Sequence, residues 1–153
     1  MNTLDFVLDI TLSVGRPTIV LDSGYTAMID TGASVPVWTD EPDILVKTYK
    51  GVREKENCGC KWFGGKTHGD LYRIPCFKLG NIEYPQFPVL VIQNSEFPTT
   101  FIIPALAFAK LRVEFDFQGK NMTVLFPPGE TSIRHLLAHV DDKNLITAQM
   151  PQI

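Results

Sequence analysis

Apolar and polar side chains alternate through the first thirty residues, and this pattern limits the possible folds more than any other feature. Apolar residues occupy every second position from Leu4 to Leu12, which is typical of a strand with one buried face. Gly15-Arg16-Pro17 and Asp22-Ser23-Gly24 interrupt the pattern with residues that favour turns. We therefore predict consecutive strands joined by tight hairpins, the last of which ends at Asp30.

The composition indicates an ordinary globular protein. The chain has 153 residues, of which 44% are hydrophobic and 20% charged, enough to bury a core. The net charge is −3 and no basic stripe is interleaved with aromatic residues, so nucleic acid is a poor candidate partner. The apolar runs are too short for a membrane span, and the first residues lack the pattern of a secretion signal. Three cysteines are too few for a disulfide scaffold, so we expect a cytoplasmic protein.

Asp30 is the strongest functional signal. A carboxylate at the end of a buried strand costs free energy unless it is solvated, paired or hydrogen-bonded, so its presence there indicates a function. Thr31 supplies a hydroxyl that can bond neighbouring main chain, and Gly32 lets another group approach closely. At Asp30-Thr31-Gly32 the sequence resembles the retropepsin-like aspartic proteases, in particular the homodimeric branch with one such motif per chain. The resemblance extends over about residues 4–126.

The resemblance implies a mainly β fold, a retropepsin-like closed β-barrel corresponding to one acid-protease half-lobe, with one short helix. A glycine-tipped hairpin at Trp62 to Gly69 is similar in placement to the flap that closes over bound peptide in this family. Ile102-Ile103-Pro104 resembles a second family signature that passes beneath the catalytic loop and opens the short helix. Proline stands there where glycine is usual.

The resemblance also implies a function. Two copies of the chain would bring their carboxylates together as an aspartic endopeptidase, a hydrolase that activates water between them and needs no metal or cofactor. Like charges at such a distance cannot both ionise cheaply, so the pair would share one proton. The catalytic residues implied are Asp30, Thr31 and Gly32. The residues implied to bind a peptide or protein substrate are Ala33, Ser34, Trp62, Phe63, Gly64 and Gly65, with Ser34 able to hydrogen-bond the carboxylate.

The remaining segments are read from local pattern. Residues 39–57 have little periodicity and are predicted to form a loop and an edge strand. We predict a first domain over residues 1–128 and a C-terminal helical extension over residues 129–153, because Pro127-Pro128-Gly129 separates the two. The predicted helix has apolar residues at helical spacing and is expected to fray after Lys143. These apolar residues are Ile133, Leu136, Leu137 and Val140.

Other residues offer alternative chemistry. Cys58, Cys60, His68 and Cys76 could together bind zinc, although the gap of one residue between the first two is unusual. His135 and His139 are four residues apart on the predicted helix but have no glutamate beside them that would complete a metalloprotease pattern. Asp22-Ser23-Gly24 is a variant of the catalytic signature but is better explained as a hairpin turn one strand away from Asp30.

The main alternative function is non-catalytic. The same fold could serve as an inactive dimerisation or peptide-binding module, which Pro104 and the unfamiliar C-terminal segment favour. The intact motif at Asp30 favours the enzyme, because a binding module gains nothing from two apposed carboxylates.

Overall fold

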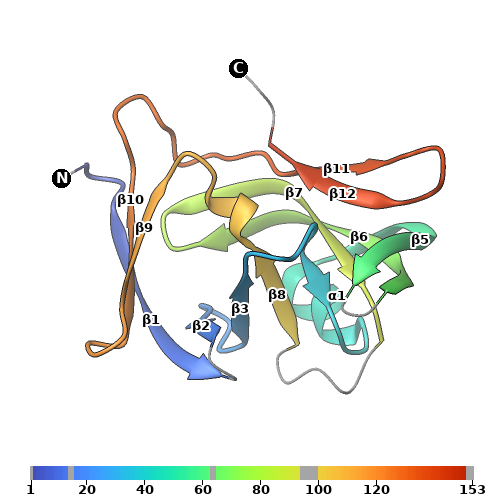
Figure 1. Cartoon of the computed structure of the whole chain (residues 1–153), viewed down its shortest axis with the longest axis horizontal. Helices are drawn as coiled ribbons and strands as arrows, with labels where there is room; N and C mark the ends of the chain where they lie inside the picture. Colours follow the sequence, from blue (N-terminus) through green and yellow to red (C-terminus); the bar gives the residue numbers. More distant parts are fainter. Residues whose placement is uncertain (1, 14–15, 63–64, 94–99, 151–153) are drawn as a thin grey trace.

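The computed structural model describes residues 2–13, 16–62, 65–93 and 100–150, and these residues form a mainly β molecule (Figure 1). The first part of the chain comprises β1 (Phe6–Ser13), β2 (Arg16–Val20), β3 (Thr26–Asp30), β4 (Val37–Trp38) and helix α1 (Asp43–Tyr49). Three long strands follow, namely β5 (Val52–Trp62), β6 (Gly65–Leu79) and β7 (Ile82–Val91). The last part comprises β8 (Phe101–Pro104), the 3-10 helix η1 (Ala105–Phe108), β9 (Arg112–Asp116), β10 (Asn121–Leu125), β11 (Leu137–Val140) and β12 (Ile146–Gln149).

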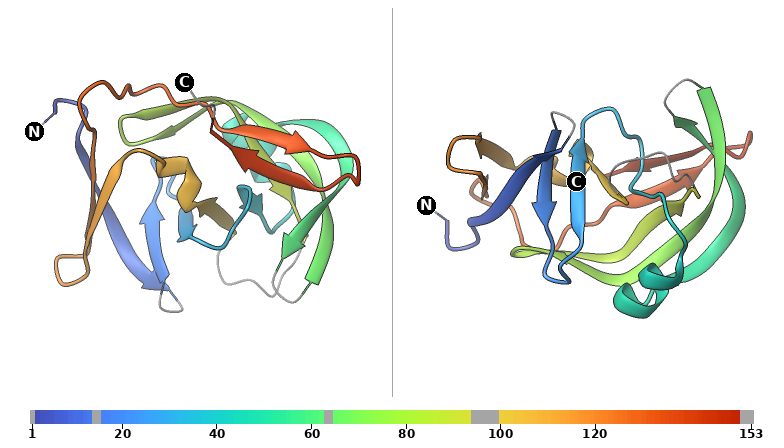
Figure 2. Two further views of the ribbon diagram at one scale, coloured as in Figure 1. Left: turned by 45° about the horizontal axis from the view of Figure 1, so that its top comes forward. Right: turned by 90° about the horizontal axis from the view of Figure 1, so that it is seen from below.

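Within this described part, ten strands form one mixed sheet. Its order is β5-β6-β7-β4-β8-β3-β2-β1-β10-β9, with β3 parallel to β8 and β4 parallel to β7. The sheet is strongly curved but does not close, because β5 and β9 remain its two edges (Figure 2). The predicted closed barrel is therefore wrong. A sheet closes into a barrel only if its two edge strands pair with each other. Neither the hydrophobic periodicity nor the turn residues of the sequence determine whether they do.

The N-terminal hairpins agree with the sequence pattern. β1 pairs with β2 and β2 pairs with β3, both antiparallel. The turn between β2 and β3 contains Gly24 at φ +88°, a left-handed conformation that glycine adopts readily, and the Gly24 N–H donates to the Leu21 carbonyl. The prediction of a turn at Asp22-Ser23-Gly24 is confirmed, and it lies at the opposite end of β3 from Asp30.

Helix α1 was not predicted, because its segment was expected to be a loop and edge strand. Asp43 in the first turn and Lys47 in the last turn complement the helix dipole, and Lys50 ends the helix in a left-handed conformation. Leu45 is the one fully buried residue of this helix. The apolar stripe that anchors the helix is therefore too short to be recognised in the sequence. β5 then forms an edge of the sheet, as expected.

The C-terminal segment differs most from its prediction. Residues 129–150 form no helix and instead contain an antiparallel hairpin, β11–β12. Leu136 is buried whereas Ile133 and Leu137 are exposed, so the residues that suggested one helical face do not share a face. The predicted helical extension and the predicted fraying after Lys143 are both wrong. The domain boundary after residue 128 stays a prediction.

The hairpin turn explains why strand pairing replaces the helix. One carboxylate oxygen of Asp141 accepts hydrogen bonds from the N–H groups of Lys143 and Leu145, at 2.8 and 2.9 Å. Asn144 adopts a left-handed conformation at φ +61°, which asparagine tolerates better than most residues. These local bonds reverse the chain and so prevent a helix from continuing through the turn.

The buried side chains separate into two clusters. The larger one is rich in aromatic rings, and its centre is here called the aromatic cluster: Trp38, Phe77, Tyr84, Phe87 and Phe101. The smaller one lies behind Asp30 and is here called the site cluster: Met28, Val35, Val37, Cys58, Cys60, Leu71, Leu90, Ile92, Ile102 and Ile146. Ile102, next to Met28 in the parallel pair β3–β8, contributes about 2 kcal/mol by its burial.

Candidate functional site

Asp30 is the last residue of β3 and is largely buried, with 8% of its surface exposed. Met28 two residues earlier is fully buried, so a strand anchored in the site cluster carries the carboxylate to its end. β8 runs parallel to β3, with Pro104 beside Asp30 in the register. The predicted neighbour of the catalytic loop, Ile102-Ile103-Pro104, therefore does lie against β3.

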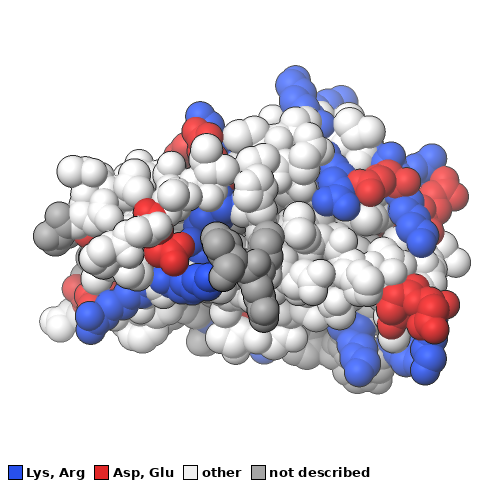
Figure 3. Space-filling view, turned by 90° about the horizontal axis from the view of Figure 1, so that it is seen from above, with Lys and Arg blue, Asp and Glu red and all other residues white. Residues whose placement is uncertain are grey.

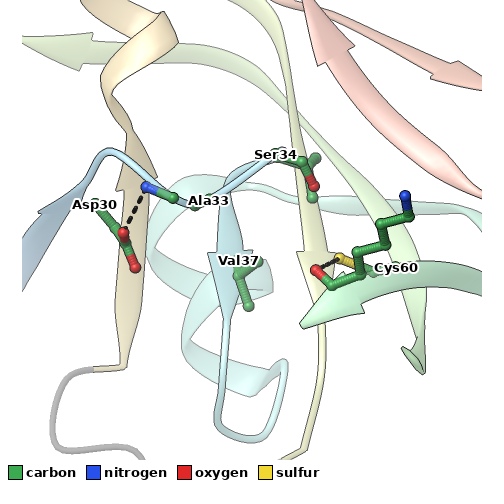
Figure 4. Close-up of a pocket in the computed structure, with 8 residues that line it drawn as sticks. Asp30, Ala33, Ser34, Val37 and Cys60 are labelled. Atoms are coloured by element: carbon green, nitrogen blue, oxygen red, sulfur yellow. Dashed lines mark hydrogen bonds between the residues drawn. The ribbon is translucent and has the colours of Figure 1, made fainter. Parts of the chain in front are cut away.

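The loop after Asp30 folds back onto the carboxylate. The Gly32 N–H donates to Asp30 Oδ1 at 2.8 Å, which supplies one of the hydrogen bonds that a buried carboxylate needs (Figure 4). Gly32 does not adopt a left-handed conformation, and a Cβ at this position would lie 3.4 Å from Asp30 Oδ1. A side chain at this position would thus be in ordinary van der Waals contact with the carboxylate. Thr31 is exposed.

Arg16 also contacts the carboxylate, which the sequence analysis did not foresee. Arg16 Nη1 lies 3.5 Å from Asp30 Oδ2, and the arginine side chain is 40% exposed. The ion pair is weak, because it is long and the arginine is partly solvated. The antiparallel register pairs Thr18 with Met28, and continuing it by two residues would place Arg16 opposite Asp30. The register of the predicted hairpin was therefore the signal in the sequence for this contact.

A pocket of about 210 Å³ opens beside Asp30, and the residues that line it come from the end of β3, the loop after it, the start of β4, and β5. Figure 4 shows Asp30 on one side of the pocket and Ser34 and Cys60 on the other. The full lining consists of Asp30, Gly32, Ala33, Ser34, Val35, Val37, Cys60 and Lys61. The walls are mainly apolar with the carboxylate at one end, an arrangement that suits an apolar group next to a reacting polar one.

The polar groups opposite Asp30 are not arranged for nucleophilic catalysis. Burial raises the pKa of the Cys60 thiol, and the nearby Ser34 hydroxyl acts in the opposite direction. Because burial dominates, the thiol stays protonated and is a poor nucleophile. The Ser34 hydroxyl is buried beside the Cys60 thiol and does not bond the Asp30 carboxylate as expected.

The predicted flap is a hairpin made by β5 and β6, and its strand forms one wall of the pocket. Trp62 pairs with Gly65 at the end of the hairpin, whereas Phe63 and Gly64 lie outside the described residues. The residues of this hairpin that line the pocket are Cys60 and Lys61. Sequence reasoning concentrated on the glycine-rich tip and therefore missed these two.

The alternative zinc site is not assembled. Cys58 and His68 lie in the flap hairpin, where Cys58 pairs with Gly69, but Cys76 pairs with Pro85 towards the other end of β6. His139 lies on a strand, so its helical relation to His135 is absent. No group of three or more candidate metal ligands occurs among the residues that the structure describes.

The search for relatives gives no independent assignment. No family model, no curated protein and no solved structure matches this chain. In the described ranges, the structure has no helix that is both long and apolar enough to cross a membrane. The functional assignment therefore depends on the site itself.

Proposed function

We propose that the chain is an aspartic endopeptidase that acts as a homodimer, in which two copies of Asp30 form the catalytic pair. The observation that carries this proposal is the Asp30 carboxylate itself. It lies at the end of a buried strand, accepts the Gly32 N–H at 2.8 Å, and faces a largely apolar pocket with the flap strand as a wall. A buried carboxylate costs free energy, so this placement is best explained by chemistry.

The proposed reaction needs both copies. The ionised Asp30 takes a proton from a water molecule, and the water oxygen attacks the peptide carbonyl carbon while the protonated Asp30 of the second copy donates its proton to the carbonyl oxygen. The resulting tetrahedral intermediate collapses as its C–N bond breaks: the protonated Asp30 gives its proton to the leaving nitrogen, and the ionised Asp30 of the second copy takes a proton from one of the two hydroxyl groups. The products are a carboxylic acid and an amine, and the pair again holds one proton. An extended peptide would lie between the loop and β5, with apolar side chains in the pocket.

Two exposed apolar residues that lie together support a second copy as the partner. Leu12 is 57% exposed and pairs with Pro17, the neighbour of Arg16. Phe117 is 53% exposed, and it lines a further pocket together with Leu12. Large apolar side chains gathered on one surface are typical of an interaction site.

The charge distribution suits an uncharged partner better than a polyanion. Figure 3 shows one face of the molecule, on which positive and negative side chains are mixed. The residues coloured in that view form no continuous basic stripe of the kind that a nucleic acid requires. This supports a peptide or protein as substrate.

Cleavage of peptides at mildly acidic pH tests the proposal. Asp30→Asn keeps an oxygen that can accept the Gly32 N–H but removes the acid, so we expect cleavage to fall by at least about a hundredfold. Asp22→Asn is the matched control, because Asp22 belongs to the other Asp-x-Gly sequence and lies in an exposed turn. Equal cleavage by wild type and Asp30→Asn would contradict the proposal.

The second candidate is a non-catalytic dimerisation or peptide-binding module. The ion pair between Arg16 and Asp30 favours it, because it gives the buried carboxylate a partner within the single chain, without a second copy of Asp30. Binding of peptides without cleavage, unchanged in Asp30→Asn, would be the result expected for such a module.

A further inference from the structure

The C-terminal hairpin connects the two walls of the pocket. One wall is the catalytic loop around Ser34, and the other is the flap strand β5 around Cys60. β11 and β12 lie over both in the views of Figures 1 and 2. The hairpin forms backbone hydrogen bonds to each wall. It therefore spans the space between the two walls.

The contact with the flap strand is close and uses main chain. The Gly59 N–H donates to the Asn144 carbonyl at 2.7 Å, and the Asn144 side-chain amide donates to the Asn57 carbonyl. Gly59 and Leu145 also form a parallel bridge. A Cβ on Gly59 would lie 3.0 Å from the Leu145 side chain, so glycine is needed at this approach. The hairpin turn is thus fixed to β5 one residue before Cys60.

The contact with the catalytic loop resembles the addition of a strand. The Ala148 N–H donates to the Ser34 carbonyl at 2.8 Å. Ile146 on the same strand is only 1% exposed and packs in the site cluster with Val35 and Cys58. Peptides often bind by adding a strand to an exposed backbone, so β12 occupies a position on Ser34 that a longer substrate would otherwise pass.

We propose that the C-terminal hairpin closes the outer end of the substrate groove and restricts the protein to short peptides. This inference rests on the proposed function. The groove runs from Asp30 to Ser34, where β12 closes it, and these two positions are separated by at most about 14 Å of chain. An extended peptide covers that distance with about four residues. In a symmetric dimer both ends are closed, so substrates are limited to about eight residues.

The test compares two peptides with the same cleavage site. A tryptic digest of casein is treated with the full chain, and a cleaved peptide is identified by mass spectrometry. It is then synthesised as a core of about eight residues and as the same core extended at both ends by flexible Gly-Ser segments. A longer peptide must displace the hairpin bonds at Gly59 and Ala148, so we expect the core to have a kcat/KM about thirtyfold higher.

Two substitutions connect this preference to the hairpin. Ala148→Pro removes the N–H that reaches Ser34, and we expect the preference to fall to about fivefold. Ala148→Gly keeps this N–H and should keep the full preference. If Ala148→Pro does not fold, Asn144→Gly serves instead, since glycine accepts the left-handed conformation while the bond to Asn57 is lost.

The possible outcomes separate this inference from the proposed function. If wild type cleaves both peptides with the same kcat/KM, the claim that the hairpin closes the groove is refuted, whereas the catalytic pair of Asp30 residues is not. A preference that Ala148→Pro and Asn144→Gly both leave unchanged overturns the role of the hairpin. No cleavage of any casein peptide overturns the proposed function and, with it, this inference.

Discussion

The two buried clusters differ in chemistry. The aromatic cluster mainly stabilises the fold, whereas the site cluster leaves room for the pocket beside Asp30. The aromatic cluster consists of large rings, and its polar atoms are hydrogen-bonded: Tyr84 donates to the Ala107 carbonyl at 2.7 Å, and the Trp38 indole donates to the Glu41 carbonyl at 2.9 Å. The site cluster consists of aliphatic side chains and two thiols, and beside it the buried Ser34 hydroxyl lies near the Cys60 thiol.

This comparison indicates that side chains fill the space around the aromatic cluster more completely than the space beside Asp30. Large rings would fill the space between the catalytic loop and β5, whereas valine and cysteine leave about 210 Å³ beside Asp30. Stability therefore has to come from the aromatic cluster. Substitutions in the two clusters should differ in size and in kind.

The largest loss of stability is expected in the aromatic cluster. Phe77→Ala removes a buried ring that contacts Tyr84, Phe87 and Phe101, so the free energy of unfolding should fall by about 4 kcal/mol. Val37→Ala in the site cluster should cost about 2 kcal/mol, because the side chain is smaller and borders the pocket. Chemical denaturation measures both. Equal losses would contradict the division between the two clusters.

A loss of about 3 kcal/mol is expected for Ile146→Ala. Ile146 is the fully buried side chain of β12 in the site cluster, so its removal leaves a cavity beneath the hairpin. Thr147→Ala is the control, since Thr147 is exposed on the same strand. If the Ile146→Ala protein unfolds at the same denaturant concentration as wild type, the hairpin is not part of the cooperative unit.

Tyr84 should make stability depend on alkaline pH. Burial raises the pKa of its hydroxyl well above the usual range, while the charge of Arg134 acts in the opposite direction. The folded protein therefore favours the neutral form, and the stabilisation is lost as the pH rises above about 10. Tyr84→Phe should cost about 1 kcal/mol at neutral pH and should reduce this alkaline loss. If the free energy of unfolding falls by the same amount from neutral to alkaline pH in both proteins, Tyr84 is not the source of this pH dependence.

The smallest effect is expected at the ion pair between Arg16 and Asp30. Arg16→Gln should change the free energy of unfolding by less than about 1 kcal/mol, because the arginine is partly solvated. Arg112→Gln breaks the more exposed pair with Glu114 and is the matched control. If Arg16→Gln still cleaves peptides while Asp30→Asn does not, the arginine is dispensable for the proposed chemistry. Loss of cleavage in both would assign Arg16 to the catalytic site.

The sequence predicted those parts of the fold that local pattern determines. Alternation and turn residues located β1 to β3 and thus the end of the strand that bears Asp30. The continuous apolar run from Phe87 to Ile92 is buried on both faces, which is typical of a central strand. These features depend on residues close together in the chain.

The predictions were wrong where contacts between residues far apart in the sequence determine the structure. Ile133, Leu136, Leu137 and Val140 fit a helical spacing, but the turn at Asp141 and the burial of Ile146 against the site cluster favour a hairpin. Closure of a barrel depends on whether β5 and β9 meet, and no local signal reports this. At the site, Asp30 was located from its motif, whereas Cys60 and Lys61 line the pocket only because β5 packs beside the loop.

Dependence of the cleavage rate on chain concentration tests the central claim most directly. If two copies of Asp30 form the catalytic pair, the rate per chain at mildly acidic pH should fall on dilution, in step with dissociation of the dimer measured by sedimentation. A constant rate per chain in a species that sedimentation shows to be monomeric would contradict the account.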